Sequence, residues 1–282
     1  MKARDNIGIG LMGLGVVGGG VARGLMADCA ALAEQVGCPL SLSKILVSDL
    51  SKRRSVEVAP DLLTTEPSEI LDHPQIDIVV EVMGGETPAL EYIRNALTRG
   101  KHMVTANKEV MAKHGPELLA LAQEHQTNIH YEASVGGGIP LIAPFQQDLA
   151  ANKISAIYAI INGTTNYILT RMASEGWDLS LALREAQKLG YAEADPTNDM
   201  EGIDAAYKLA ILASLAFQTK VSPQDVYRQG ISRLSGRDFR YAHELGYAIK
   251  LLAIAKQSDD FIEERVHPVF IPQDFLLAKV DG

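Results

Sequence analysis

The first half of the chain alternates short, almost continuously apolar runs with segments of helical pattern, and this alternation constrains the fold most. The apolar runs span residues 7–12, 42–47, 76–82, 102–105 and 128–133. Such runs are typical of strands that are buried on both faces of a parallel sheet. Because these strands alternate with helices, the sequence predicts an α/β fold with a doubly wound parallel sheet.

Turn-forming residues mark the ends of the helices in this half. The Thr87-Pro88 pair offers an N-cap followed by proline at the first helical position, and Gly100 closes the same helix. The Gly115-Pro116 pair is expected to divide residues 108–126 into two short helices, because proline lacks the amide hydrogen that a helix interior needs.

The pattern changes near Gly136, where we place a boundary between two domains, residues 1–135 and 136–282. The second domain is expected to be α+β and mostly helical. Its expected helices span residues 140–151, 164–175, 180–189, 202–217, 223–229 and 238–257, and its expected strands span residues 154–161 and 265–271.

A G-x-G-x-x-G pattern follows the first expected strand, with Gly13, Gly15 and Gly18 as its glycines. The first glycine permits a tight turn, the second lets the backbone approach a pyrophosphate, and the third allows close contact between helix and strand. The following helix start offers free amide hydrogens to phosphate. We interpret these glycines, with Val16 and Val17, as the dinucleotide site of a Rossmann-type fold; a merely glycine-rich turn is the alternative.

The choice between NAD and NADP stays open. In this fold an acidic residue after the second strand binds the ribose hydroxyls. The candidate is Asp49, which favours NAD and implies one long first helix to about Gln35. The three cations that follow, Lys52, Arg53 and Arg54, either meet the 2′-phosphate of NADP or belong to a solvated loop.

Composition and charge exclude several classes of protein. Hydrophobic residues make up 47% of the 282 residues and charged residues 22%, as in ordinary globular proteins. The net charge of −9 argues against binding nucleic acid or an anionic membrane. Two cysteines suit a reducing compartment such as the cytoplasm, and no apolar run is long enough for a transmembrane helix. The stretch from Asn6 to Ala22 has only the outline of a signal peptide, because Asp5 lies in the region that should be basic.

Ligands of doubly wound sheets collect at the carboxyl ends of the strands. Three segments are expected there: residues 81–85, 105–108 and 132–140. Met83 and Gly84 of the first are candidate cofactor contacts. Lys108, just beyond a strand end, is either a residue of the cleft or an ordinary surface lysine.

The segment richest in reactive side chains spans residues 190–208, with five acids between Glu193 and Asp204. Asp204 and Lys208 are four residues apart and share one face of a helix. One interpretation is that the acids decorate a helix N-terminus and that Asp204 and Lys208 form a surface pair. The other is a polar pocket for a zwitterion, where carboxylates hold an ammonium group and a lysine serves a carbonyl or hydroxyl oxygen.

Two further features are weaker. Gly163 and Thr164 follow an expected strand and fit either contact with a ligand or a plain N-cap. The seven histidines form no H-E-x-x-H or other zinc spacing.

Together these segments resemble homoserine dehydrogenases over essentially the whole chain. The resemblance rests on G-L-G-V-V-G at 13–18, E-V-M-G-G at 81–85, T-A-N-K at 105–108, E-A-S-V-G-G-G-I-P at 132–140, N-G-T-T-N-Y-I-L at 162–169 and G-Y-A-E-A-D-P-T-N-D-M-E-G-I-D-A-A-Y-K-L at 190–209. It implies reversible, NAD- or NADP-dependent hydride transfer between L-aspartate 4-semialdehyde and L-homoserine, on the route to threonine, methionine and isoleucine.

The resemblance also implies roles for single residues. Glu193, Asp199 and Asp204 would hold the amino and hydroxyl groups of the substrate, beside Gly163 and Thr164. Two lysines would flank the reacting oxygen, Lys208 on one side and Lys108 on the other. One of the two is the acid or base, and either could instead orient the oxygen while a water relays the proton.

Three more expectations come from the resemblance alone. A monovalent cation, Na⁺ or K⁺, would bind mainly through backbone oxygens of Glu132, Val135, Gly137 and Ile139. The second domain would bind substrate and form a homodimer. Relatives continue after the strand at 265–271 with further strands and, in many bacteria, an ACT domain, so the chain is expected to be shortened at its C-terminus. Ser48 stands where NADP-using relatives often carry arginine, which together with Asp49 weakens the case for NADP without removing it.

Two rival hypotheses stay open. The chain could be a fragment or sensor that binds NAD(P) without catalysis, which cofactor binding without turnover would reveal. It could also be an oxidoreductase of the same architecture with another small substrate. The constellation from Glu193 to Lys208 suits a small zwitterion better than a sugar and argues against the second rival.

Overall fold

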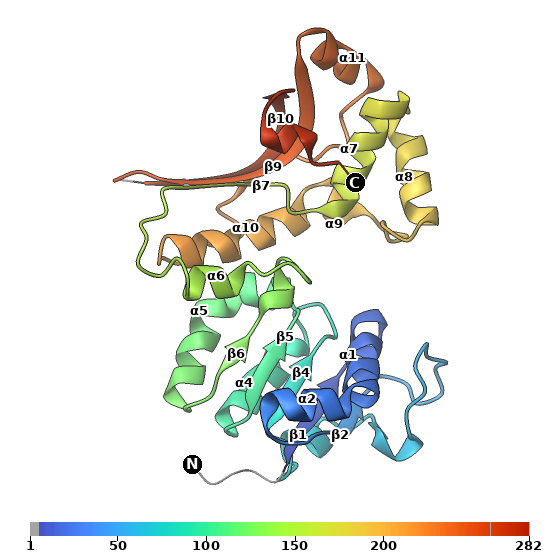
Figure 1. Ribbon diagram of the computed structural model, residues 1–282, viewed down its shortest axis with the longest axis vertical. Helices are drawn as coiled ribbons and strands as arrows, with labels where there is room; N and C mark the ends of the chain where they lie inside the picture. Colours follow the sequence, from blue (N-terminus) through green and yellow to red (C-terminus); the bar gives the residue numbers. More distant parts are fainter. Residues whose placement is uncertain (1–5, 260, 282) are drawn as a thin grey trace. The chain divides into compact units, whose positions relative to one another are not determined.

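The computed structural model describes residues 6–259 and 261–281, which form two compact units that divide between Pro140 and Leu141 (Figure 1). The first unit contains one parallel sheet with the strand order β3-β2-β1-β4-β5-β6. In chain order its strands are β1 (Ile7–Met12), β2 (Leu40–Leu46), β3 (Leu63–Thr64), β4 (Ile78–Glu81), β5 (His102–Thr105) and β6 (Ile129–His130). The prediction of a Rossmann-type doubly wound sheet is confirmed. Asp5, which argued against a signal peptide, lies outside the described residues.

Helices connect these strands, and the strand order reverses between β1 and β4. The connecting helices are α1 (Val16–Ala27), α2 (Cys29–Val36), α3 (Ser68–Leu71), α4 (Ala89–Thr98) and α5 (Lys108–Glu124), with 3₁₀ turns η1 (Pro60–Leu62) and η2 (Glu132–Ser134). In open α/β sheets a ligand binds beyond the carboxyl ends of the strands at such a reversal. The fold therefore places the expected site at the ends of β1 and β4.

The core beside this reversal holds α1 against the sheet. Ile9 and Leu11 of β1, Ile45 of β2 and Val80 of β4 are buried in one cluster with Ala22 of α1. Burial of such side chains contributes roughly 1.5–3 kcal/mol each. The glycine turn between β1 and α1 is thus anchored on both sides by packed elements.

Two glycines inside β1 are required by close packing. A Cβ at Gly8 would lie 1.7 Å from the backbone oxygen of Gln75, and one at Gly10 would lie 2.5 Å from Cγ2 of Ile70. Neither distance is compatible with a side chain. Both glycines sit within the strand, so they serve packing of the segment 70–76 on the sheet.

Three helix predictions in this unit are wrong. The first helix is two helices, α1 and α2, which meet at an angle of 80° next to Asp28. Pro116 lies inside α5, which runs unbroken for 17 residues because its buried face, including Val110 and Leu118, holds it in place. Thr87 is no N-cap, since α4 begins after Pro88. Gly100 does close α4, with a φ of 73°.

The shortest helices and strands of this unit could not be predicted from the sequence patterns. The expected strand at 128–133 contains only the two residues of β6 and then turns into η2. The two-residue β3 and the four-residue α3 were not predicted. Elements of this length carry too few residues to show a hydrophobic period.

The second unit contains a four-stranded mixed sheet with the order β7-β9-β10-β8 (Figure 1). Its strands are β7 (Ala156–Ala159), β8 (Tyr227–Arg228), β9 (Tyr247–Gln257) and β10 (Ile262–Pro272). The long strands β9 and β10 pair antiparallel from the Gln257–Ile262 pair to the Tyr247–Pro272 pair. The helices of this unit are α6 (Ile142–Gln146), α7 (Gly163–Glu175), α8 (Leu179–Lys188), α9 (Thr197–Met200), α10 (Ile203–Ala216) and α11 (Gly236–Glu244), with the 3₁₀ turn η3 (Leu276–Lys279).

The predictions for this unit are partly wrong. Residues 238–257 are the end of α11 followed by β9, with Gly246 (φ 80°) as the turn between them. Residues 223–229 are a turn and β8, which pairs with β10. The helix expected at 140–151 is the five-residue α6. In contrast, α7, α8 and α10 match the expected ranges closely, and β10 contains the expected strand at 265–271.

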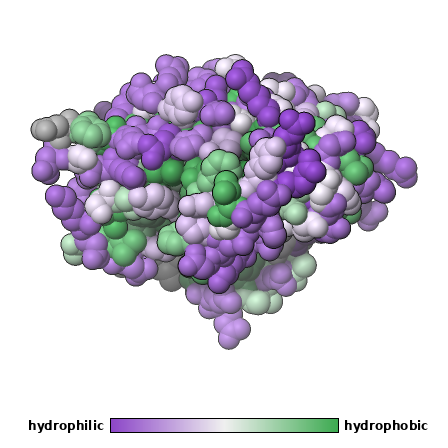
Figure 2. Space-filling view, turned by 90° about the horizontal axis from the view of Figure 1, so that it is seen from above, coloured by the Kyte–Doolittle hydropathy of each residue, from purple (hydrophilic) through white to green (hydrophobic). Residues whose placement is uncertain are grey.

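The surface of the second unit in Figure 2 is mostly hydrophilic, with separate apolar areas between the polar side chains. Exposed aromatic side chains occur on all four of its strands: Tyr158 on β7, Tyr227 on β8, Tyr247 on β9 and Phe270 on β10. In the part of the chain that the structure describes, no single helix is long and apolar enough to cross a membrane. Among these described residues, only α1 and α2 taken together, as a bent pair, reach the required length and composition.

Candidate functional site

The glycine turn between β1 and α1 assigns a different steric role to each glycine. Gly13 has a φ of 102°, and its added Cβ would lie 2.9 Å from the oxygen of Val82. An added Cβ at Gly18 would lie 2.0 Å from the oxygen of Gly13. Gly15, the N-cap of α1, faces open space with no described atom within 4 Å. The turn thus has tight backbone contacts on one side and free room for a ligand at the helix N-terminus.

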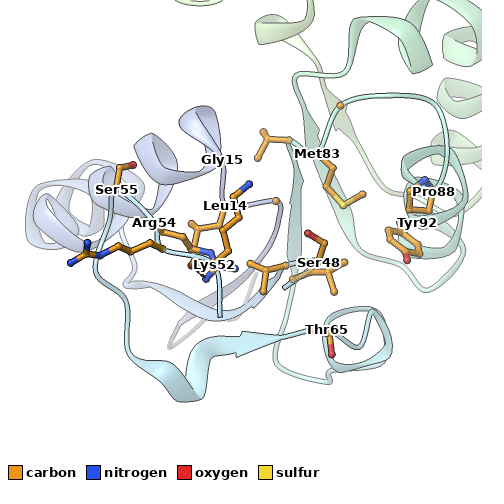
Figure 3. Close-up of a pocket in the computed structure, with 16 residues that line it drawn as sticks. Leu14, Gly15, Ser48, Lys52, Arg54, Ser55, Thr65, Met83, Pro88 and Tyr92 are labelled. Carbon is orange, nitrogen blue, oxygen red and sulfur yellow. Dashed lines mark hydrogen bonds between the residues drawn. The ribbon is translucent and has the colours of Figure 1, made fainter. Parts of the chain in front are cut away.

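This room is part of a pocket of about 620 Å³ within the first unit (Figure 3). The pocket is lined by Gly13, Leu14, Gly15, Leu46, Val47, Ser48, Lys52, Arg53, Arg54, Ser55, Thr65, Val82, Met83, Gly84, Pro88 and Tyr92. In Figure 3, Pro88 and Tyr92 stand on one side, and Lys52, Arg54 and Ser55 on the other. A volume of this size is typical of cofactor pockets. The free amide hydrogens at the start of α1 suit a phosphate there.

The acidic residue expected to mark NAD does not line this pocket. The Asp49 carboxylate accepts hydrogen bonds from the hydroxyl of Ser51 at 2.7 Å and from its backbone nitrogen at 2.8 Å. These two bonds hold the pKa of Asp49 below its usual range. Asp49 is exposed and belongs to a turn, whereas the three cations Lys52, Arg53 and Arg54 do line the pocket.

The Arg54 guanidinium is held by backbone oxygens of its own loop. It donates to the carbonyl of Lys52 at 2.7 Å and to the carbonyl of Asp49. The loop is also fixed to α1, because the side chain of Ser55 lies against Gly19. The positive charge beside the pocket therefore sits on an ordered loop.

The remaining cofactor candidates lie near the pocket but differ in position. Met83 and Gly84 line it, and Gly84 has a φ of 76°. Val16 and Val17 occupy the first two positions of α1 and are exposed, Val16 to 89%. Lys108 is the first residue of α5, whose N-cap Asn107 accepts a hydrogen bond from the Val110 nitrogen at 3.1 Å.

A polar cluster occupies the second unit, where three segments meet. It consists of Asn162, the N-cap of α7, together with Asp199 of α9 and Asp204 and Lys208 of α10. The Asn162 side-chain nitrogen donates to Asp199 Oδ1 at 2.7 Å and to Asp204 Oδ2 at 2.8 Å. One amide therefore joins two carboxylates that are five residues apart in the sequence.

Lys208 completes the cluster. Its Nζ lies 2.9 Å from Asp204 Oδ2 and donates to the Ile161 carbonyl at 3.0 Å. The side chain of Asp204 is only 3% exposed, and that of Lys208 only 17%. Because so little of either side chain is exposed, the alternative of a surface pair is wrong. A charge at this depth requires partners such as these. Among the described residues two of the three hydrogens on Nζ have an acceptor, which leaves one for an incoming oxygen.

The other substrate candidates surround this cluster less closely. The Thr164 hydroxyl donates to the Tyr191 carbonyl at 2.7 Å, next to Gly163 at the start of α7. Glu193 is exposed on the same loop as Tyr191, and its backbone oxygen accepts a hydrogen bond from Gln187 at 3.0 Å. No contact with its carboxylate is recorded among the described residues.

The role of Asn162 could not be read from the sequence pattern. The N-G-T-T motif at 162–165 indicates roles for Gly163 and Thr164 only. The available signal was an asparagine at a helix start, which predicts an N-cap. The structure adds that its amide oxygen caps Thr165 at 2.8 Å while its nitrogen binds the two aspartates.

The segment of the proposed cation site is a compact turn. Glu132 begins η2, and its backbone oxygen accepts a hydrogen bond from Val135 at 3.3 Å. Gly137 has a φ of 61°, and the Ile139 nitrogen donates to Gly136 at 3.0 Å. Backbone carbonyl oxygens are ligands of the kind that Na⁺ and K⁺ take, and the cation site stays a prediction. Within the described residues, no group of three His, Cys, Asp or Glu side chains is placed to hold a metal ion.

Comparison with known proteins identifies relatives for both units. The family model of the homoserine dehydrogenase NAD-binding domain matches residues 13–132, and that of homoserine dehydrogenase matches residues 140–282. The solved homoserine dehydrogenase of Staphylococcus aureus has a TM-score of 0.85 and 38% identity, over 98% of this chain and 68% of that chain. The chain belongs to the homoserine dehydrogenase family.

Other homoserine dehydrogenases are more similar still. That of Bacillus subtilis is 45% identical over 280 residues, which cover 99% of this chain and 64% of the relative. The crystal structure from Thiobacillus denitrificans has a TM-score of 0.93 and 47% identity, over 98% of this chain and 64% of that one. The chain therefore spans a little under two thirds of the length of these relatives. A hyperthermophilic archaeal homoserine dehydrogenase of 27% identity, with a TM-score of 0.79, was solved in complex with NADPH.

Proposed function

We propose that this chain acts as an NAD(P)-dependent homoserine dehydrogenase, which transfers hydride reversibly between L-homoserine and L-aspartate 4-semialdehyde. The observation that carries the proposal is the polar cluster of Asn162, Asp199, Asp204 and Lys208 in a member of this family. It offers carboxylates for an ammonium group and a lysine for an oxygen, as a small amino acid with a reactive oxygen requires. The product would serve synthesis of threonine, methionine and isoleucine.

The cluster suggests how the substrate oxygen is handled. The bound nicotinamide cofactor supplies or accepts the hydride. Asp204 and the Ile161 carbonyl orient the Lys208 ammonium, whose remaining N–H is directed to the substrate oxygen. In reduction the oxygen gains a proton while the carbon gains hydride, and in oxidation the proton leaves. Lys208 or Lys108 is the acid or base, while the other orients the oxygen.

The substrate's ammonium group would be held by carboxylates of the same unit. Asp199 contributes the oxygen that Asn162 does not occupy, and Glu193 contributes the exposed carboxylate of its loop. Gly163 and Thr164 would meet the substrate at the start of α7. A charged ammonium beside carboxylates forms the stronger, charge-assisted type of hydrogen bond.

The cofactor would bind across the glycine turn, with Gly13, Gly15, Val16, Val17 and Gly18 around its pyrophosphate. Met83, Gly84 and Lys108 would lie beside the rest of the cofactor. NADP is the preferred form in this proposal, because Arg53 and its two cationic neighbours line the pocket and Asp49 does not. NAD is the alternative, and the ratio of the dissociation constants for NADPH and NADH decides between them.

Three accompanying proposals concern the surroundings of the reaction. A monovalent cation would be bound by Glu132, Val135, Gly137 and Ile139. A homodimer would form through the second unit, where Tyr158, Tyr227, Tyr247 and Phe270 leave aromatic rings exposed on its four strands. The cytoplasm suits the free thiols of Cys29 and Cys38, which form no disulfide.

The test of the proposed function is absorbance at 340 nm. The purified protein is mixed at alkaline pH with L-homoserine and either NADP or NAD. Growth of the reduced nicotinamide signal, faster with NADP, is the expected result. A flat trace from folded protein that binds NADPH would refute the proposal and support the rival of a non-catalytic NAD(P)-binding protein.

The lysines are tested by substitution. Lys208→Ala and Lys108→Ala are each expected to lose most of kcat and to keep the circular dichroism spectrum. Lys188→Ala, on the exposed surface of α8, is the matched control and should leave kcat unchanged. Turnover at the wild-type rate in either of the first two variants would remove that lysine from the mechanism.

A further inference from the structure

Glu81 is a carboxylate at the end of β4 with no exposed surface. Its Oε1 accepts a hydrogen bond from the backbone nitrogen of Met83 at 2.9 Å, and its Oε2 accepts one from the Thr105 hydroxyl at 2.6 Å. Met83 lines the cofactor pocket, and Thr105 ends the neighbouring strand β5. The two oxygens of one side chain therefore reach two strand ends.

Thr105 passes this connection on to the start of α5. Its hydroxyl oxygen accepts a hydrogen bond from the Asn107 nitrogen at 3.0 Å. The Asn107 side chain then donates to the Gly85 carbonyl at 2.7 Å and caps the Val110 nitrogen at 3.1 Å. Both Thr105 and Asn107 are buried. The bonds thus run from the loop after β4 to the helix start and back to the same loop.

The direction of each bond fixes which residue types fit. The backbone N–H of Asn107 donates to the Thr105 hydroxyl, and this hydroxyl donates its own hydrogen to Glu81. The backbone N–H of Met83 donates to the other oxygen of Glu81, and a carboxylate accepts on both sides. A buried carboxylate is costly unless its hydrogen bonds are complete. Glu81 therefore requires both of its donors, Met83 in the loop after β4 and Thr105 at the end of β5.

We propose that Glu81 is a positioning residue, which holds the cofactor loop 83–85 through its own oxygen and holds Lys108 through Thr105. It touches neither substrate nor cofactor. This inference rests on the proposed function, since it concerns the lysine of that reaction. The network has two arms. The bond between Glu81 and Met83 is expected to set cofactor affinity, and the bonds of Thr105 to Glu81 and Asn107 are expected to set the position of Lys108.

Thr105→Val tests the second arm, because valine has nearly the shape of threonine but no hydroxyl. We expect kcat for homoserine oxidation to fall about tenfold or more, since small misplacements of reacting groups have effects of this order. The dissociation constant of NADPH, measured by its fluorescence, should rise less than in a Glu81 variant, because the bond from Met83 to Glu81 remains. Thr105→Ser keeps the hydroxyl and is expected to restore kcat.

Glu81→Leu tests both arms. Leucine accepts no hydrogen bond, so the bonds from Met83 and from Thr105 are both lost. We expect kcat to fall as in Thr105→Val and the NADPH dissociation constant to rise about fivefold, as the loss of one hydrogen bond of about 1 kcal/mol implies. Amide hydrogen exchange in residues 105–111 should be faster in both variants and unchanged in Thr105→Ser.

Several results would overturn the inference. These are an unchanged kcat in Thr105→Val, an equal loss of kcat in Thr105→Ser, or equal NADPH dissociation constants in Glu81→Leu and the wild type. If Thr105→Val fails to fold, Thr105→Ala removes the same hydroxyl without added bulk and is judged by the same measurements. Failure of the proposed function looks different: the wild type would not oxidise homoserine, while the NADPH dissociation constants and hydrogen exchange would still decide whether the network acts as proposed.

Discussion

Asn162→Asp would replace the donor at the centre of the polar cluster by an acceptor while it keeps the N-cap of α7. Aspartate caps a helix as well as asparagine does. The side-chain nitrogen, however, becomes an oxygen that faces Asp199 and Asp204, to which the amide now donates at 2.7 and 2.8 Å. Each of these bonds to a charged group stabilises by about 1.5–3 kcal/mol. The loss of both lowers the free energy of unfolding by about 3–6 kcal/mol at pH 8.

The dependence on pH separates repulsion from simple loss of the bonds. Like charges raise the pKa of the introduced carboxyl in the folded state. A raised folded-state pKa gives stability that is present below the unfolded value and is lost as the pH rises through the folded value. The deficit of Asn162→Asp is therefore expected to be larger at pH 8 than at pH 5. Asn162→Ser, which keeps a cap without adding charge, should show a smaller deficit that hardly depends on pH.

The assay is urea unfolding followed by tryptophan fluorescence. Trp177 is the single tryptophan of the chain and lies between α7 and α8, so its signal reports on the second unit. A stability of Asn162→Asp equal to that of the wild type at pH 8 would refute the bridging role of the Asn162 amide. A deficit without pH dependence would refute the repulsion.

Two further variants test the glycine turn and a helix cap. Gly18→Ala places a Cβ 2.0 Å from the Gly13 oxygen, so NADPH affinity should fall tenfold or more, whereas Gly20→Ala, which meets open space, should bind normally in the same fluorescence titration. Ser235→Ala removes the capping box of α11 and is expected to cost about 1 kcal/mol in urea unfolding at pH 7. The Ser235 hydroxyl lowers the pKa of Asp238, so this contribution is present above the usual aspartate pKa and should disappear as the pH falls through the lowered value.

The parallel sheet could be predicted because its strands carry their own signals. β1 and β5 have the predicted bounds, since a strand buried on both faces is a continuous apolar run between turn residues. The long strand β9 was mistaken for helix. Its sequence from Tyr247 to Gln257 is rich in alanine and leucine, and only pairing with β10 makes it extended.

Single candidate residues of the site could be named from the sequence, but most of the hydrogen bonds between them could not. Asp204 and Lys208 are one helical turn apart, so their pairing follows from the sequence. Asn162 lies 37 and 42 residues from its two aspartates, and Glu81 lies 24 residues from Thr105. No local spacing encodes such pairs, because the fold alone brings them together. The depth at which Asp204 is buried was equally invisible in the sequence.

The packing glycines of β1 have a practical consequence for searches by pattern. Gly8, Gly10 and Gly13 also spell G-x-G-x-x-G, five residues ahead of the glycines around the turn. The first pair supports backbone packing within a strand, and only the later set stands where a strand meets a helix. A genome scan that accepts the first match would assign the phosphate contacts to residues inside the sheet. Mutagenesis guided by that match would unfold the protein and be mistaken for loss of cofactor binding.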